Sequence, residues 1–281
     1  MQNWQCRYAP SLGALEDTPF KVWGTEEFVE GTEKPAVFFG VYGLPDFYTL
    51  WRHRGRKAIL WAGSDIRHFV NGYWLDDKGS IRIDPQALAE WINKNCESYV
   101  ENGAEHEALM VYGIESKVVP SFMGNVNDFP ISFQASERPR VYASVSGNDF
   151  SLYGWDVIEN IADKCDVDFF LYGNTVPWST RHSNVFVRGR IPKEQMNNEI
   201  KSMQCGLRVL EFDGFSEVLA KSVLWGQYPI SRIGYPYIQS YKSNDELIKL
   251  LNELKYKKTP NLVAREYYLK NLNKYPWNSH V

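Results

Sequence analysis

An acidic residue able to act as a base follows a buried strand in the first half of the sequence. Residues 58–63 form a short apolar run, and Ser64 and Asp65 come directly after it. Ligands of parallel sheets bind beyond the carboxyl ends of the strands, where partial desolvation raises the pKa of a carboxyl group. Asp65 is therefore predicted to accept a proton from a substrate. Its alternative role is to cap the next segment.

Small residues follow the strands predicted in the second half. Glycine and asparagine at such turns let backbone N–H groups approach a phosphate, particularly where a helix begins. The same residue types also make ordinary tight turns. The residues predicted to line a phosphate site in this way are Gly147, Asn148, Tyr153, Gly154 and Gly173.

An arginine-rich turn precedes a further predicted helix. The segment Arg188-Gly189-Arg190-Ile191-Pro192 ends one strand and leads into residues 193–203. Arg190 is predicted to pair with a phosphate because a guanidinium group binds phosphate oxygens in a bidentate manner. The alternative is a solvated surface arginine.

The most informative segment runs from Cys205 to Gly226. Residues 206–210 are predicted to form a buried strand and residues 215–226 a helix. The turn between them is Asp213-Gly214-Phe215-Ser216. The N-terminus of this helix is expected at the carboxyl edge of the predicted sheet, where ligands of such sheets bind.

The elements that position these residues alternate regularly between strand and helix. Apolar strands separated by helices fill residues 36–120, and the same alternation returns over residues 141–231. A proline-rich segment, residues 121–139, separates the two stretches. The sequence therefore predicts two Rossmann-like, doubly wound α/β domains, residues 1–122 and 123–260. Residues 261–281 are predicted to form a C-terminal helix that packs back on the first domain.

Composition excludes several classes of protein. The chain has 281 residues, 44% of them hydrophobic, which is typical of a globular protein and not of a disordered one. The net charge of -3 argues against a generally basic nucleic-acid binder. The 4 cysteines have no CxxC pair and no histidine at ligand spacing, which argues against a zinc site and a disulfide framework and favours a reducing, cytoplasmic compartment. No metal site and no permanently bound cofactor are predicted. No segment is long and apolar enough to predict a membrane span.

The turn at 213–216 resembles the donor-binding signature of GT-B glycosyltransferases, in which two such domains face each other across a cleft. In that family an acid eight residues after the first holds the ribose hydroxyls of the nucleotide. The corresponding residue here is Lys221. Lys221 is predicted to contact a phosphate instead, or Glu217 to replace the missing acid. An i,i+4 surface pair of Glu217 with Lys221 is the remaining alternative.

Two shorter segments resemble phage DNA β-glucosyltransferases. Ser64-Asp65-Ile66-Arg67 is similar to the Thr-Asp-Ile-Arg of those enzymes, whose aspartate is the catalytic base. Residues 189–192 are similar to their Gly-Lys-Ile-Pro turn, which contacts the donor base. This resemblance implies that Asp65 is the base, that Arg190 and Ile191 bind the donor, and that a hydroxymethylated base in double-stranded DNA is the acceptor.

The resemblances together predict a glycosyltransferase that moves a sugar from a nucleotide-sugar donor, a UDP-sugar, to an acceptor hydroxyl with inversion. The second domain is expected to bind the donor, and the first the acceptor. The residues added to the donor site are Asp213, Gly214, Phe215, Ser216 and Lys221. Those expected on the acceptor side are Tyr42, Gly43, Ser64, Arg67 and Asn102.

Two other functions remain open at this point. One is a glycosyltransferase that acts on a saccharide or glycolipid instead of DNA, and the other is a protein that binds a nucleotide or saccharide without catalysis. A basic cluster at residues 52–57 favours contact with a polyanion, although it also suits a solvated loop. A nicotinamide-dependent dehydrogenase is disfavoured because no GxGxxG segment follows a strand.

Overall fold

The chain folds into two compact units. The computed structural model describes residues 3–15, 17–73, 78 and 82–279. Unit 1 comprises Met1–Gly124, Phe212–Phe215 and Asn271–Val281, and unit 2 comprises Asn125–Glu211 and Ser216–Lys270. The short segment 212–215 therefore belongs to unit 1, although the strand before it and the helix after it belong to unit 2.

Unit 1 is built on a parallel sheet with strand order β2-β1-β3-β4-β5-β6. Its two central strands, β3 and β4, are buried on both faces. Phe38 and Ile59 belong to one hydrophobic cluster, and Val37 and Leu60 to another. Side chains of a strand alternate between faces, so the apolar runs seen in the sequence form the middle layer. The strands are β1 (Gln5–Tyr8), β2 (Glu26–Glu27), β3 (Ala36–Phe39), β4 (Lys57–Leu60), β5 (Cys96–Val100) and β6 (Ser116–Val118).

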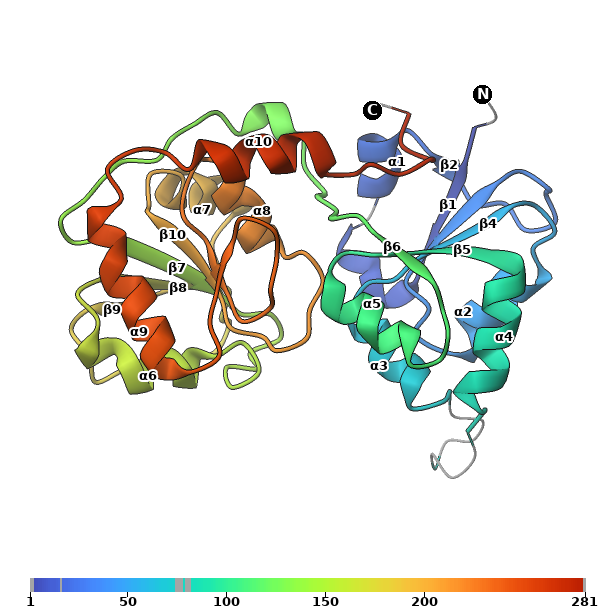
Figure 1. The fold of residues 1–281 in the computed structure, drawn as a ribbon, viewed down its shortest axis with the longest axis horizontal. Coiled ribbons are helices and arrows are strands. Elements are labelled where there is room, and N and C mark those ends of the chain that lie inside the picture. The colour runs from blue at the N-terminus through green and yellow to red at the C-terminus, as the bar shows by residue number, and fades with distance from the viewer. Residues whose placement is uncertain (1–2, 16, 74–77, 79–81, 280–281) are drawn as a thin grey trace. The chain divides into compact units, whose positions relative to one another are not determined.

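Helices cover both faces of this sheet. Four helices contribute side chains to the cluster that contains Phe38, and α1 contributes Trp23 to the opposite cluster (Figure 1). The helices are α1 (Thr18–Trp23), α2 (Leu44–Arg52), α3 (Ser64–Val70), α4 (Pro85–Asn95) and α5 (Gly103–Met110), with a 3₁₀ turn at Pro10–Leu15. The strand-and-helix pattern does not predict α3 as a separate helix. It begins directly at Ser64, so Asp65 lies in its first turn.

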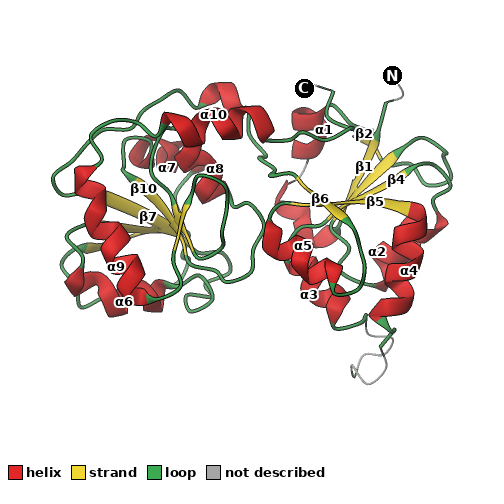
Figure 2. Cartoon of the chain, viewed as in Figure 1, coloured by secondary structure: helices red, strands yellow, loops and turns green. Residues whose placement is uncertain are grey.

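Unit 2 repeats the architecture with strand order β12-β11-β10-β7-β8-β9, again parallel throughout. Figure 2 shows the strands of each unit as one layer between helices. The strands are β7 (Arg140–Ser144), β8 (Asp168–Tyr172), β9 (Val185–Gly189), β10 (Cys205–Arg208), β11 (Ile230–Ser231) and β12 (Gln239–Ser240). The helices are α6 (Trp155–Ile161), α7 (Lys193–Ile200), α8 (Glu217–Leu224), α9 (Asn244–Glu253) and α10 (Leu262–Asn271), with 3₁₀ turns at Val126–Asp128, Ala162–Lys164 and Leu254–Tyr256. The predicted two-domain α/β fold is confirmed.

The end of the chain divides differently from the predicted segment 261–281. Nearly all of α10 groups with unit 2, where Arg265 donates to the carbonyl of Leu224 at 2.7 Å and the Tyr268 hydroxyl to that of Pro236 at 3.0 Å. The residues after it belong to unit 1. Tyr275 and Trp277 lie in the cluster on the α1 side of the sheet, where aromatic burial holds them.

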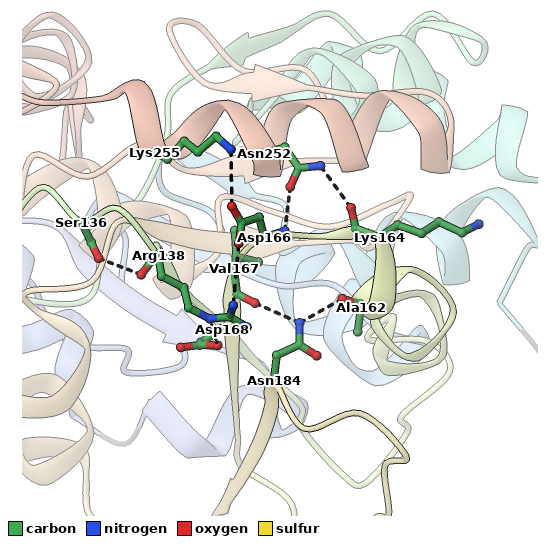
Figure 3. A network of polar contacts seen from close by, with 10 residues as sticks. All are labelled: Ser136, Arg138, Ala162, Lys164, Asp166, Val167, Asp168, Asn184, Asn252 and Lys255. Atoms are coloured by element: carbon green, nitrogen blue, oxygen red, sulfur yellow. Dashed lines mark hydrogen bonds and ion pairs between the residues drawn. The ribbon is translucent and has the colours of Figure 1, made fainter.

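A polar network stabilises the amino-terminal end of β8 in unit 2 (Figure 3). Arg138 donates to Asp168, the first residue of β8, at 2.7 Å. The side-chain amide of Asn184 donates to the carbonyls of Ala162 and Val167 at 2.9 and 3.0 Å. This edge is opposite to the strand ends predicted to bind ligand, so the network is structural.

Candidate functional site

Asp65 is completely buried beneath the carboxyl ends of β3 and β4. Its exposed fraction is 0%, and its carboxylate accepts the backbone N–H of Val41 at 2.8 Å and that of Ala62 at 2.9 Å. Burial raises the pKa of Asp65 to about 7, while these hydrogen bonds oppose the rise. The sequence predicts a partly desolvated carboxylate open to substrate. The structure instead occupies both oxygens with backbone N–H groups, because the loops after β3 and β4 close over them.

A surface pocket of about 450 Å³ lies beside this buried carboxylate. Three residues predicted on the acceptor side contribute to it, namely Tyr42, Gly43 and Arg67. The Tyr42 hydroxyl lies 3.0 Å from Ser64 Oγ, and partial burial raises the pKa of Tyr42 to about 12. The full set of lining residues is Tyr42, Gly43, Leu44, Pro45, Arg67, His68, Asn71, Gly72 and Tyr73.

His68 is the pocket residue that sequence reasoning misses. It is exposed, and its ring meets that of Tyr42 edge-on at 5.7 Å. The basic surroundings of His68 in the sequence suggest a solvated or phosphate-facing side chain. Recognition of α3 as a helix provides the missing signal, because His68 follows Ser64 by one turn and shares its face.

Asn102 does not reach this pocket. It is buried, its Oδ1 caps α5 by accepting the N–H of Glu105 at 3.0 Å, and its Nδ2 donates to the Asp213 carbonyl at 2.7 Å. The predicted acceptor contact of Asn102 is replaced by a role in holding the turn 213–215. Both polar groups of the side chain are used within unit 1.

Glu101 holds the same turn from the end of β5. One carboxylate oxygen accepts the N–H of Phe215 at 2.8 Å, and the other accepts the Ser121 hydroxyl. A Cβ at position 214 would overlap Glu101 Oε2, so a larger residue there would have to displace this carboxylate from Phe215. The three residues predicted to bind the donor, Asp213, Gly214 and Phe215, are therefore anchored in unit 1.

Burial perturbs two carboxyl groups near this turn. It raises the pKa of Glu101 above its ordinary value, and the neighbouring negative charge of Glu101 adds to the burial that raises the pKa of Glu105. Glu105 accepts the N–H of Glu101 through one oxygen at 2.7 Å, and its other oxygen is buried without a hydrogen bond. Repulsion between the two carboxylates favours keeping a proton on the pair.

In unit 2, Asn148 joins two loops at the carboxyl edge of the sheet. Its Nδ2 donates to Thr175 Oγ1 and its Oδ1 accepts the Thr175 N–H, both at 2.8 Å. The loop after β7 is thereby tied to the loop after β8. Asn148 consequently shapes this edge instead of offering a free amide to a ligand, while Gly147 beside it is exposed.

Gly154 and Gly173 are required by close packing. Gly173 has a φ of 99°, and a Cβ there would overlap the Val145 carbonyl oxygen. Gly154 is the N-cap of α6, next to Val209. Tyr153 packs its ring under the guanidinium of Arg208, with 4.7 Å from ring centroid to Cζ. These residues set the shape of the strand-end surface.

Two exposed cations follow the end of β9. Arg190 and Lys193 are exposed, and within the described residues neither has an ion-pair partner. Arg188, by contrast, binds Glu199 at 3.0 Å. Ile191 is half-buried between the two open cations. Of the predicted donor residues, Arg190 is therefore the one best placed to meet an anion.

The start of α8 carries the remaining predicted residues. Ser216 is the N-cap and accepts the N–H of Leu219 at 3.4 Å. The Lys221 ammonium lies 3.4 Å from the Glu217 carboxylate, and the exposed fraction is 9% for the Lys221 side chain and 44% for that of Glu217. Burial lowers the pKa of Lys221, and the charge of Lys193 contributes in the same direction. The predicted i,i+4 pair exists, but its lysine is buried and its glutamate faces solvent.

The basic cluster at residues 52–57 is neutralised in part. Arg52 lies 3.2 Å from Glu30, and Arg56 donates to Glu97 at 2.7 Å. His53 is buried, and its Nε2 lies 2.9 Å from the Lys34 carbonyl. These contacts neutralise Arg52 and Arg56, while Arg54 stays exposed and has no ion-pair partner among the described residues.

Comparison with solved structures identifies the fold. The sequence matches no protein-family model, and no curated protein sequence matches it. Sucrose-phosphate synthase from Thermosynechococcus elongatus aligns with 94% of this chain and 76% of its own at a TM-score of 0.59 and 13% identity. The lipopolysaccharide outer core galactosyltransferase WaaB aligns over 94% of this chain and 78% of its own length, with a TM-score of 0.56 and 11% identity. TarM of S. aureus, solved with UDP, aligns over 84% of this chain with a TM-score of 0.55 and 14% identity.

The fold is that of the GT-B glycosyltransferases. The chain spans about half the length of TarM, of which 51% is covered. A specific likeness to the phage DNA enzymes does not emerge from these comparisons. No helix among the described residues has the length and apolar character needed to cross a bilayer. Nor does any group of three or more potential metal ligands occur in the described part of the chain.

Proposed function

We propose that this protein is a glycosyltransferase that uses a nucleotide sugar, preferentially a UDP-sugar, to glycosylate an acceptor hydroxyl. The observation that carries the proposal is the pair of open cations, Arg190 and Lys193, at the carboxyl edge of the second sheet of a GT-B fold. Ligands of such sheets bind at this edge. The UDP bound in the TarM structure supports the choice of nucleotide.

The donor diphosphate would be held by Arg190, with Lys193 beside it. As the sugar–phosphate bond breaks, both electrons of that bond move to the diphosphate, and the two cations stabilise this growing negative charge. Lys221 contributes to donor binding indirectly, because its ion pair fixes the exposed carboxylate of Glu217 on the first turn of α8. Glu217 thus takes the place of the acid that the GT-B resemblance predicts at position 221, and its chemistry suits the ribose hydroxyls.

The acceptor hydroxyl would bind in the pocket lined by Tyr42, Arg67 and His68. In a single displacement with inversion, the acceptor oxygen forms a bond to the anomeric carbon and its proton passes to a base. We assign that proton to His68, because its imidazole lines the pocket and an imidazole nitrogen can act as a general base. Asp65 positions the loops that build the pocket, since both of its oxygens already accept backbone N–H groups.

A saccharide or glycolipid hydroxyl fits the pocket better than a base in DNA. Binding to duplex DNA draws most of its affinity from phosphate contacts with free cations. Two arginines of the cluster at 52–57 are engaged by Glu30 and Glu97, which leaves Arg54 as an exposed cation without an ion-pair partner in the described part of the chain. The free thiols of all four cysteines agree with a reducing, cytoplasmic compartment.

Slow hydrolysis of the donor tests this function without knowledge of the acceptor. The protein is incubated with a panel of UDP-sugars, and UDP release is measured together with UDP affinity by calorimetry. Turnover that is lost in His68→Ala while UDP affinity persists supports the enzyme. UDP binding with no release from any donor, and no transfer to saccharide, glycolipid or hydroxymethylated DNA acceptors, indicates the non-catalytic binding protein instead.

A further inference from the structure

Helix α2 presents an apolar stripe to solvent. Leu44, Phe47, Tyr48 and Trp51 follow the i, i+3, i+4, i+7 spacing that places side chains on one helical face. Tyr48 is 54% exposed and Trp51 52% exposed. A surface helix ordinarily turns its polar face outward, so an open aromatic face marks an interaction site.

The stripe is a shaped surface. With Pro45 and Ile83, its residues line a shallow hollow of about 480 Å³. The rings of Tyr48 and Trp51 stack at 5.7 Å with an interplanar angle of 27°, and the Arg52 guanidinium lies over Tyr48 at 5.4 Å. Tyrosine and tryptophan combine an apolar body with a polar end, which suits the boundary between lipid and water.

The hollow adjoins the candidate acceptor pocket. Leu44 and Pro45 line both of them. Whatever covers the aromatic stripe therefore lies beside the groups assigned to the acceptor hydroxyl. An acceptor with an apolar portion next to its polar head would occupy both surfaces at once.

Charge and size select the occupant. Arg54 and Arg67 are exposed and, in the described part of the chain, have no ion-pair partner. A specific protein interface needs about 20–30 residues a side, whereas six residues line this hollow. A small aromatic surface flanked by cations instead fits the negatively charged surface of a lipid bilayer.

We infer that α2 docks on an anionic lipid surface and that the acceptor is a lipid drawn from it. The apolar chains of that lipid lie against Phe47, Tyr48 and Trp51, and its hydroxyl-bearing head enters the pocket at Arg67. The lipid-acceptor part rests on the proposed glycosyltransferase function. The docking part stands on the surface itself.

Vesicle co-sedimentation tests the docking. The full chain is mixed with phosphatidylcholine vesicles with and without phosphatidylglycerol. Binding is expected only with the anionic lipid, and it should weaken as salt screens the charges. The double substitution Tyr48→Ser/Trp51→Ser should reduce binding by at least about tenfold, because it removes the apolar insertion. Tyr237→Ser/Tyr256→Ser is the matched control, since these aromatics of unit 2 are 59% and 70% exposed, and it should bind like the wild type.

Several outcomes overturn the inference. Lipid docking is refuted if the wild type binds neither vesicle. It is also refuted if the Tyr48/Trp51 variant binds the anionic vesicles as well as the wild type does. Self-association that the same variant abolishes makes a second copy of the chain the occupant. UDP calorimetry on every variant separates the two proposals. UDP binding without vesicle binding refutes docking alone, whereas vesicle binding without UDP binding or release refutes the glycosyltransferase and leaves docking intact.

Discussion

The carboxylate of Glu101 accepts the backbone N–H of Phe215 at 2.8 Å, across 114 residues of sequence. This bond seats the turn 213–215 in unit 1, and the Asn102 amide adds a second bond to the Asp213 carbonyl. The turn leads directly into α8, where Ser216 caps the helix. A residue at the end of β5 in the first sheet thus fixes the chain immediately before the helix that carries Glu217 and Lys221.

Removal of this anchor should loosen the turn. Glu101→Ala leaves the buried N–H of Phe215 and the Ser121 hydroxyl without their acceptor, which should reduce the free energy of unfolding by about 1–3 kcal/mol. Urea unfolding measures the loss, with Glu107→Ala on the exposed side of α5 as the control. An Ala variant as stable as the control would mean that solvent replaces the carboxylate at no cost.

Asp65 makes stability depend on pH. Its pKa rises from 3.8 to about 7 on folding, so the folded chain binds this proton more tightly than the unfolded chain. The corresponding stabilisation is complete below 3.8 and is lost as pH increases to about 7. Thermal unfolding across this range should show a falling midpoint.

Asp65→Asn should remove that part of the slope while lowering stability overall. An amide offers one acceptor, so its NH₂ must face the N–H of either Val41 or Ala62. This mismatch should cost about 1–3 kcal/mol in the free energy of unfolding. Glu101 and Glu105 also have raised pKa values and add slope of the same sign. A variant with the full wild-type slope would therefore contradict the assignment to Asp65.

Arg190 is expected to bind the donor. Arg190→Ala should weaken UDP binding by about 1–3 kcal/mol, the magnitude of a lost charge-assisted hydrogen bond. Arg188→Ala is the matched control because Arg188 already pairs with Glu199. Calorimetry with UDP compares the two. Equal affinities would show that Arg190 is an ordinary solvated side chain.

Asn184 tests the network at the opposite edge of the same sheet. Asn184→Ala removes the side-chain donor to the carbonyls of Ala162 and Val167, although the Ala162 carbonyl keeps the N–H of Cys165. The free energy of unfolding should therefore fall by about 1–3 kcal/mol. UDP affinity should not change. Asn160→Ala, on the exposed side of α6, provides the control. A loss of UDP binding in a folded Asn184 variant would indicate that the nucleotide binds at the amino-terminal edge of the sheet and would contradict the proposed donor site.

The sequence predicts the alternation of buried strands and helices because apolar runs and glycine or proline breaks are local properties. It also identifies the turn at 213–216. It does not predict that Glu101 and Asn102 hold this turn, since the contact joins distant parts of the chain. Likewise, it predicts the type and place of Asp65 but not its complete burial, which depends on Val41 N–H. It does not place His68 in the pocket, because the strand-and-helix pattern does not predict the short helix α3.

Lys221 and Glu217 provide the sharpest test of the donor site. Lys221→Glu should destabilise the fold, because it buries a carboxylate next to the exposed carboxylate of Glu217, and it should weaken UDP binding. The exchanged pair, Glu217→Lys with Lys221→Glu, restores opposite charges one turn apart and should recover most of the stability. If Lys221 acts by orienting Glu217 toward the ribose, UDP affinity should stay low in the exchanged pair, because the exposed group is now a cation. Calorimetry of stable, folded protein decides the matter. Tighter UDP binding in Lys221→Glu would instead show that an acid at position 221 serves the ribose directly, and would refute the role assigned to Glu217.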